Sequence, residues 1–190
     1  SRPIGLAVVP AFWLGMLDLV CLDYALRLYA LIICDIGTGG SWLFVVSKCP
    51  PDGESVFMTY MTRYASIFGC HKKILGDRDS IFSGPSATSL FEDVGVERAT
   101  TDSFAHNQLG SAERRIGVYR YSIDRLKVEN PPNSEAGWDL ALCVMSNQLL
   151  NEADSTGTAP SLRISGRNTS ILRHACLLYT SPSPRDVSLS

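Results

Sequence analysis

Three acidic residues lie at positions where their carboxylates could carry chemistry. Asp23 lies within the apolar segment VCLDYAL, Asp77 follows the apolar segment KKILG, and Glu113 opens a long predicted helix. An isolated carboxylate is costly to bury in an apolar strand, and a bound metal ion would offset that cost. Two other interpretations stay open: Asp23 on the solvent side of a half-exposed strand, and Glu113 as an acid favoured by the helix dipole.

The elements that must position these acids follow from the spacing of apolar residues. Strand-like runs cover 16–26, 28–35 and 41–49, with the turn signals GTGG at 37–40 and PPDG at 50–53. A helical period predicts a helix over 54–68, and further helices are predicted over 86–94, 111–128 and 138–150. Short strands are predicted over 72–76 and 96–101. This order predicts an α/β fold, with a mixed sheet flanked by helices.

The spacing of the acids adds a second kind of information. Between Asp77 and Glu113 lie 35 residues, and between Asp23 and Asp77 lie 53. This spacing resembles the D, D, 35 residues, E signature of retroviral and LTR-retrotransposon integrase catalytic cores. GDRDSIF (76–82) is similar to the family's S-D-x-G-x-x-F, and NQLGSAERR (107–115) to its Q-N-G-x-x-E-R. Trp138, Asn147 and GTAPSLRISGR (157–167) resemble its closing W…N…G-x-x-P…G-R pattern.

The resemblance implies a ribonuclease-H-like fold, with a five-stranded mixed sheet and helices on both sides. It also implies that Asp23, Asp77 and Glu113 are catalytic residues that hold two Mg²⁺ or Mn²⁺ ions. Two such ions would support phosphoryl transfer, in which water trims a DNA 3′ end and the freed 3′-hydroxyl attacks target DNA. The implied activity is that of a polynucleotidyl transferase, and the implied partners are DNA and further copies of the chain.

The residues expected to contact DNA are local, because the net charge of −2 excludes binding by bulk positive charge. Gln108 and Gly110 are expected in a flexible loop, 108–111, before the helix that carries Glu113. Cations on that helix would neutralise phosphates: Arg114, Arg115, Arg120, Arg125 and Lys127. The alternative for each cation is an ordinary solvated helix face.

Several positions depart from the integrase pattern. Asp79 replaces the family's glycine after the second acid, and Leu109 replaces the asparagine before Gly110. Asp18 competes with Asp23 as the first acid, but its 58 residues to Asp77 fit the pattern less well. Two alternative functions follow: an inactive integrase-like module that binds nucleic acid or protein, and an unrelated protein with an N-terminal membrane segment at 4–20.

The remaining expectations concern the ends and the cysteines. The chain opens with Ser rather than Met, which favours a fragment with a linker at 1–15, a catalytic core at 16–152 and an extension at 153–175. Residues 176–190 are expected to be a disordered tail, because CLLYTSPSPRD resembles a translated sequencing adapter. Six scattered cysteines without a C-x-x-C pair favour reduced thiols over a zinc site. The expected location is a nuclear or cytoplasmic nucleoprotein particle, without secretion and without a membrane.

Overall fold

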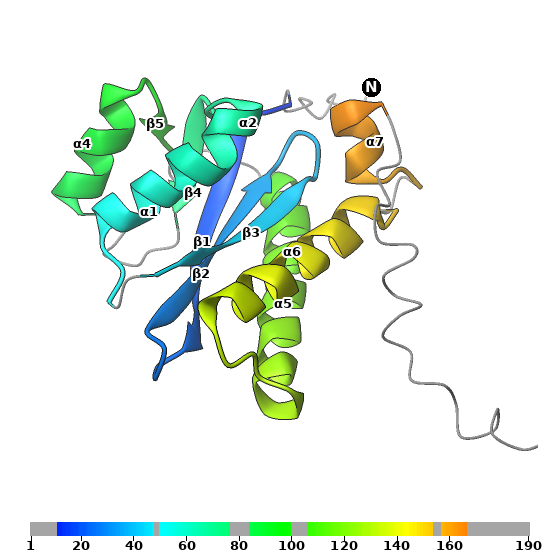
Figure 1. Cartoon of the computed structure of the whole chain (residues 1–190). Coiled ribbons are helices and arrows are strands. Elements are labelled where there is room, and N and C mark those ends of the chain that lie inside the picture. Colours follow the sequence, from blue (N-terminus) through cyan, green and yellow to red (C-terminus); the bar gives the residue numbers. More distant parts are fainter. Residues whose placement is uncertain (1–10, 48–49, 77–83, 100–105, 154–156, 167–190) are drawn as a thin grey trace, which may run out of the picture.

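The computed structural model describes residues 11–47, 50–76, 84–99, 106–153 and 157–166, and the side chains of 106–108 lie outside that description. Five strands form one sheet in the order β3-β2-β1-β4-β5, with helices on both sides of it (Figure 1). The strands are β1 (Leu14–Asp23), β2 (Leu28–Asp35), β3 (Ser41–Val46), β4 (Lys73–Gly76) and β5 (Glu97–Arg98). The α/β class and the five-stranded mixed sheet expected from the sequence are confirmed.

The strands change direction at β1. The first three strands form an antiparallel meander, β1 with β2 and β2 with β3. β4 then lies parallel to β1 on its other side, and β5 lies parallel to β4. β1 is therefore a central strand that is covered on both edges, as its ten residues of mostly apolar sequence predict.

One side of the sheet is covered by the helices α1 (Gly53–Thr59), η1 (Tyr60–Ala65), α2 (Ser66–Phe68) and α4 (Pro85–Asp93). Asp52 caps α1, because its side chain accepts the Ser55 N–H while the Ser55 side chain accepts the Asp52 N–H. The predicted helix over 54–68 is therefore present, but its middle part, η1, is a π-helical segment. π-helical segments are rare and often lie beside polar or functional groups, and here Tyr60 and Tyr64 from η1 both contact His71.

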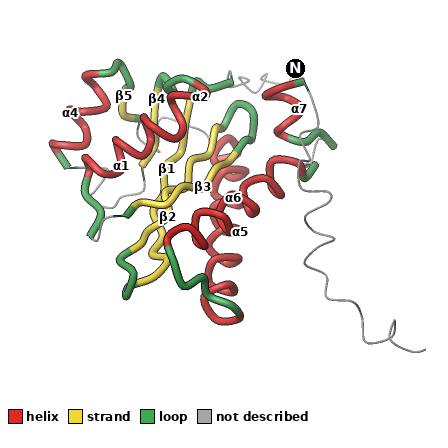
Figure 2. The backbone as a smooth tube through the Cα atoms, in the orientation of Figure 1, coloured by secondary structure: helices red, strands yellow, loops and turns green. Residues whose placement is uncertain are grey.

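The other side is covered by α5 (His106–Glu129) and α6 (Glu135–Asn151), with the short α7 (Pro160–Ser165) next to the end of α6 (Figure 2). The buried stripe of α5 contains Ala112, Ile116, Tyr119 and Ile123, which pack against β2 and β3 together with Trp138 and Leu142 of α6. Spacings of three and four residues place this stripe on one face of the helix, as predicted.

Two sequence predictions need correction. Gly110 and Ser111 belong to α5, so the predicted flexible loop at 108–111 is helix instead. A glycine costs a helix about 1 kcal/mol, but Leu109 offsets that cost by packing against Leu14 and Leu75. The alternative of a membrane segment at 4–20 is also wrong where that segment is described, because Leu14 to Asp23 form the central strand of the sheet. Among the described residues, no helix has the length and apolarity to cross a membrane.

Candidate functional site

The candidate site lies where β1 passes the carboxyl end of β4. The parallel register pairs Met16 with Leu75 and Leu17 with Gly76, the last residue of β4. Asp18 is the next residue on β1, and 3% of its surface is exposed. Leu17 and Leu19 on either side of it pack toward the other face, with the helix η1. Strand alternation therefore directs the Asp18 side chain toward α5, where Arg120 binds it.

Asp23 lies at the far end of the same strand. It lies six positions after Leu17, which corresponds to about 20 Å along a strand. Its carboxylate accepts hydrogen bonds from the backbone N–H groups of Ala25 and Leu26, at 2.7 and 2.9 Å. Asp23 therefore stabilises the turn between β1 and β2, and the structure does not bring it to the end of β4.

Asp77 follows Gly76 in the chain and lies outside the described residues. A carboxylate of β1 that shares a metal ion with a residue next to Gly76 must lie close to Leu17, because two ions of such a site lie only about 4 Å apart. Asp18 meets this condition and Asp23 does not. The geometry therefore favours Asp18 as the first acid.

Glu113 lies on the part of α5 that runs beside this end of the sheet. Leu109, one turn before it, packs against Leu14 and Leu75, and Arg120, seven residues after it, binds Asp18. Seven residues are almost two turns, so Glu113 and Arg120 lie on nearly the same face, about 10 Å apart along the helix axis. Glu113 is exposed. The structure thus places Glu113 and Asp18 on the same side of the sheet, at the same end of β4.

The predicted DNA-contacting residues differ in their surroundings. Arg115 is partly buried and donates to the Leu149 carbonyl of α6 at 3.1 Å. Arg125 pairs with Glu129, and Lys127 pairs with Asp124, all on α5. Arg114 is exposed, and the Gln108 side chain lies outside the described residues. These residues therefore do not form one uniform basic strip, because Arg115 and Arg120 point toward the protein.

The sequence matches no protein-family model and no curated protein, but the fold is similar to solved structures. One is the HTLV-2 integrase catalytic core domain in complex with magnesium, in trimeric form, with a TM-score of 0.61 and 12% identity over 82% of this chain and 97% of that one. The dimeric form of the same domain has a TM-score of 0.59 and 13% identity, and the match covers 81% of this chain and 97% of that one. A third is a simian T-cell lymphotropic virus intasome in complex with PP2A regulatory subunit B56 gamma. Its TM-score is 0.64 and its sequence identity is 13%, and the match covers 96% of this chain and 61% of that one.

The chain has the fold of a retroviral integrase catalytic core. The ribonuclease-H-like architecture implied by the sequence pattern is thereby confirmed. In this integrase-like core, β1 lies parallel to β4, and the long helix α5 packs beside β1.

The donors at this site are suited to a hard cation. Asp18 offers two buried carboxylate oxygens, and the nearest part of α5 offers the carboxylate of Glu113, and oxygen atoms of this kind are the donors that hard cations prefer. Within the described part of the chain, no group of three His, Cys, Asp or Glu residues could hold a metal ion. Both oxygens of Asp18 accept hydrogen bonds from Arg120 instead.

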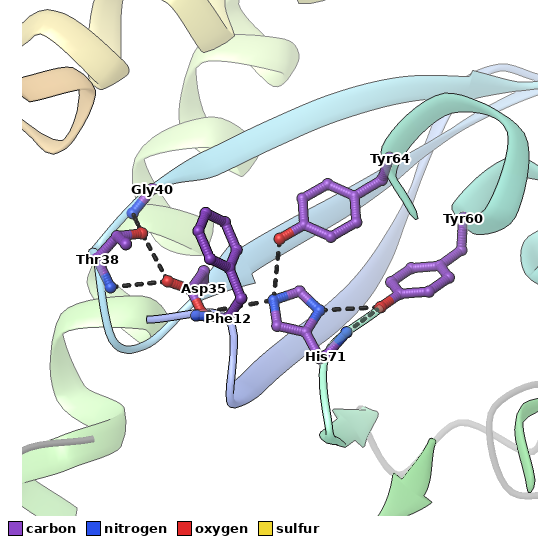
Figure 3. A network of polar contacts seen from close by, with 7 residues as sticks. All are labelled: Phe12, Asp35, Thr38, Gly40, Tyr60, Tyr64 and His71. Atoms are coloured by element: carbon purple, nitrogen blue, oxygen red, sulfur yellow. Dashed lines mark hydrogen bonds and ion pairs between the residues drawn. The ribbon is translucent and has the colours of Figure 1, made fainter. Parts of the chain in front are cut away.

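A second buried polar cluster lies on the opposite side of the sheet and joins Asp35, at the end of β2, to His71 (Figure 3). The His71 Nε2 atom lies 3.5 Å from Asp35 Oδ1 and 3.0 Å from the Tyr64 hydroxyl, and its Nδ1 atom lies 3.0 Å from the Tyr60 hydroxyl. Asp35 also accepts hydrogen bonds from Thr38 and from the Phe12 N–H.

This cluster of a histidine, a carboxylate and two phenols is chemically capable of acid–base work, but its placement indicates a structural role. His71 and Asp35 are both about 1% exposed. Burial by itself raises the pKa of Asp35, but hydrogen bonds from His71 and Thr38 outweigh it, so that the pKa lies below its ordinary value. The carboxylate is thus stabilised in its charged form by partners that tie β2, β4 and η1 together.

Sequence reasoning missed Arg120 as the partner of Asp18, and it missed the whole Asp35–His71 cluster. A signal for Asp35 is present, because this acid ends an apolar strand directly before the GTGG turn. Among the described residues, Cys21, Cys34, Cys70 and Cys143 are free thiols. Burial raises the pKa of Cys34 to about 12, so this thiol stays protonated and unreactive at neutral pH.

Proposed function

We propose that the chain is the catalytic core of a retroelement integrase, a polynucleotidyl transferase that processes DNA 3′ ends and joins them to target DNA. The observation that carries the proposal is Asp18, a buried carboxylate on the central strand, beside the carboxyl end of β4 and below the helix that carries Glu113. A buried carboxylate needs a cationic partner, and a bound metal ion is a partner that can also take part in catalysis.

Asp18, Asp77 and Glu113 would hold the metal ions, with Asp18 in the role that the spacing pattern gave to Asp23. Mg²⁺ or Mn²⁺ is the expected cofactor, since the donors are carboxylates and the similar HTLV-2 domain was solved with magnesium. Two ions, when bound, would activate an attacking hydroxyl and stabilise the leaving oxygen of a phosphodiester. The protein's own contribution is to hold the carboxylates rigidly: Asp18 by the sheet on both edges, and Glu113 by the packing of α5.

DNA is the proposed partner, and the exposed Arg114, next to Glu113, is the residue best placed to bind a phosphate near the reacting bond. The proposed contact with DNA continues along α5 through four further residues, which are Gln108, Gly110, Arg125 and Lys127. Arg115 more directly stabilises the contact with α6 through the Leu149 carbonyl. A homo-oligomer within a nuclear or cytoplasmic nucleoprotein particle is proposed as well, because the similar structures are dimeric and trimeric forms and an intasome.

One observation favours a second candidate, an inactive module with the same fold that binds nucleic acid or protein. Arg120 already compensates the charge of Asp18, so the buried acid has a partner without any metal ion. In a decayed enzyme such a pair would be permanent.

Strand transfer with a labelled oligonucleotide duplex, assayed with Mg²⁺ and with Mn²⁺, separates the two candidates. The enzyme is expected to join DNA, and Glu113→Gln is expected to lose at least 100-fold in rate, on the order of a lost catalytic group. Glu92→Gln, which makes the same change at an exposed position of α4 on the other side of the sheet, serves as the control with nearly unchanged rate. DNA binding without joining in either metal would favour the inactive module.

A further inference from the structure

The contact between Arg120 and Asp18 is bidentate and uses both carboxylate oxygens. The Arg120 Nε–H donates to Oδ2 at 2.9 Å, and Nη2–H donates to Oδ1 at 2.7 Å. The planar guanidinium fork matches a carboxylate in this way, and both bonds are charge-assisted. A divalent cation that approaches both oxygens from the same direction therefore competes with Arg120 for this carboxylate.

The two partners differ strongly in their exposure. The Asp18 side chain is 4% exposed on a central strand, whereas the Arg120 side chain is 46% exposed at the end of a flexible stem. Because the Arg120 guanidinium is already half solvated, breaking its contact with Asp18 costs little. Leaving Asp18 without a partner would strand a charge in the interior, which is costly. The buried Asp18 therefore requires a cationic partner in every state of the protein, whereas the charge of Arg120 is already partly stabilised by solvent.

We propose that Arg120 is an exchangeable counter-cation for Asp18, which holds this carboxylate in the metal-free protein and is displaced when a divalent cation binds. This inference rests on the proposed function, because it takes Asp18 as a metal ligand. It adds that the affinity for the metal ion is set by a competition with Arg120, and that metal binding separates the Arg120 guanidinium from Asp18 on the face of α5 that carries Glu113.

The helix itself does not depend on this ion pair, which makes the exchange feasible. α5 is held against the sheet by Ile116, Tyr119 and Ile123, and the Tyr119 hydroxyl bonds with Ser41 of β3 at 2.9 Å. The backbone near Arg120 is therefore fixed by apolar packing while its side chain is partly solvated. Arg125 provides a matched control, because it is also an arginine of α5 but pairs with Glu129 at the surface.

The test measures Mn²⁺ binding to the full chain by isothermal titration calorimetry, for the parent protein, Arg120→Gln, Arg120→Lys, Arg125→Gln and Asp18→Asn. Arg120→Gln is expected to bind Mn²⁺ about tenfold tighter, which corresponds to about 1.4 kcal/mol, because no competing ion has to leave. Arg120→Lys keeps the positive charge but cannot form the bidentate contact, so its affinity for Mn²⁺ is expected to lie between those of the parent and Arg120→Gln. Arg125→Gln is expected to match the parent, and Asp18→Asn to lose binding.

Thermal unfolding gives a second readout that does not depend on activity. In EDTA, Arg120→Gln is expected to have a lower Tm than the parent, and Mn²⁺ is expected to raise its Tm by more than it raises the parent's. If Arg120→Gln and Arg120→Lys bind Mn²⁺ no tighter than the parent while Asp18→Asn loses binding, the exchange is refuted and the metal site stands. If Asp18→Asn binds as the parent does, or no variant binds Mn²⁺, both the exchange and the role of Asp18 are refuted.

Discussion

Replacing Asp35 by alanine is expected to lower the free energy of unfolding by about 3–5 kcal/mol, because each buried donor left without its acceptor costs about 1–3 kcal/mol. Asp35 accepts from the Phe12 N–H at 2.9 Å, from the Thr38 N–H at 2.7 Å and from the Thr38 hydroxyl at 2.6 Å. It also faces the fully buried Nε2 of His71. The substitution leaves these groups without their acceptor at a place where little water enters, so the loss exceeds that of one ordinary hydrogen bond.

The pH dependence of this effect has a definite sign. The pKa of Asp35 is lowered in the folded protein from an unfolded value of 3.8, so the stability it contributes is fully present above that value. It is lost as the pH falls below 3.8 and through the folded pKa. The difference between the parent and Asp35→Ala should therefore be larger above pH 3.8 than in stronger acid, where it shrinks.

Urea unfolding followed by circular dichroism at several pH values measures both effects. Asp93→Ala, which removes an exposed carboxylate at the end of α4, is the control and should change the stability by less than about 0.5 kcal/mol. A loss below about 1 kcal/mol for Asp35→Ala, or a difference that grows in acid, would refute the reasoning.

The remaining stability predictions use the same unfolding assay. Gly15→Ala should cost about 1–3 kcal/mol through overpacking, because a Cβ atom there would lie 2.6 Å from the His71 ring; a neutral result would mean that the ring moves freely. Ser146→Ala should cost about 1–3 kcal/mol, since its hydroxyl accepts the buried Leu43 N–H, whereas a cost near zero would indicate that another group replaces it. Asp139→Asn should cost under 1 kcal/mol, because its ion pair with Arg63 is nearly half exposed; a larger cost would contradict that estimate.

The fold was predictable from the sequence because its strands and helices carry clear apolar patterns. The buried stripe of α5 and the apolar runs of the first three strands are examples, and local spacing alone defines them. The π-helical segment η1 was not predictable in this way, since it coincides with contacts that Tyr60 and Tyr64 make with His71, which lies 11 and 7 residues further along the chain. The start of α5 was missed because Gly110 indicates a loop, and only tertiary packing of Leu109 overrides it.

The first acid could not be chosen by counting residues along the chain. Asp18 and Asp23 both follow apolar residues in β1, and their spacings to Asp77 differ by only five residues. The choice depends on the register between β1 and β4, in which Leu17 lies opposite Gly76, and this pairing is a property of the folded sheet. The bidentate contact with Arg120 likewise joins residues 102 positions apart and leaves no local signal.

The most direct test of the central claim compares the strand-transfer rates of Asp18→Asn and Asp23→Asn in Mg²⁺. The structure places Asp18 at the proposed metal site and Asp23 in a turn, where asparagine can still accept the hydrogen bonds through its carbonyl oxygen. Asp18→Asn is expected to abolish DNA joining, and Asp23→Asn to keep nearly the parent rate. Loss of joining in Asp23→Asn with activity retained in Asp18→Asn would contradict the assignment.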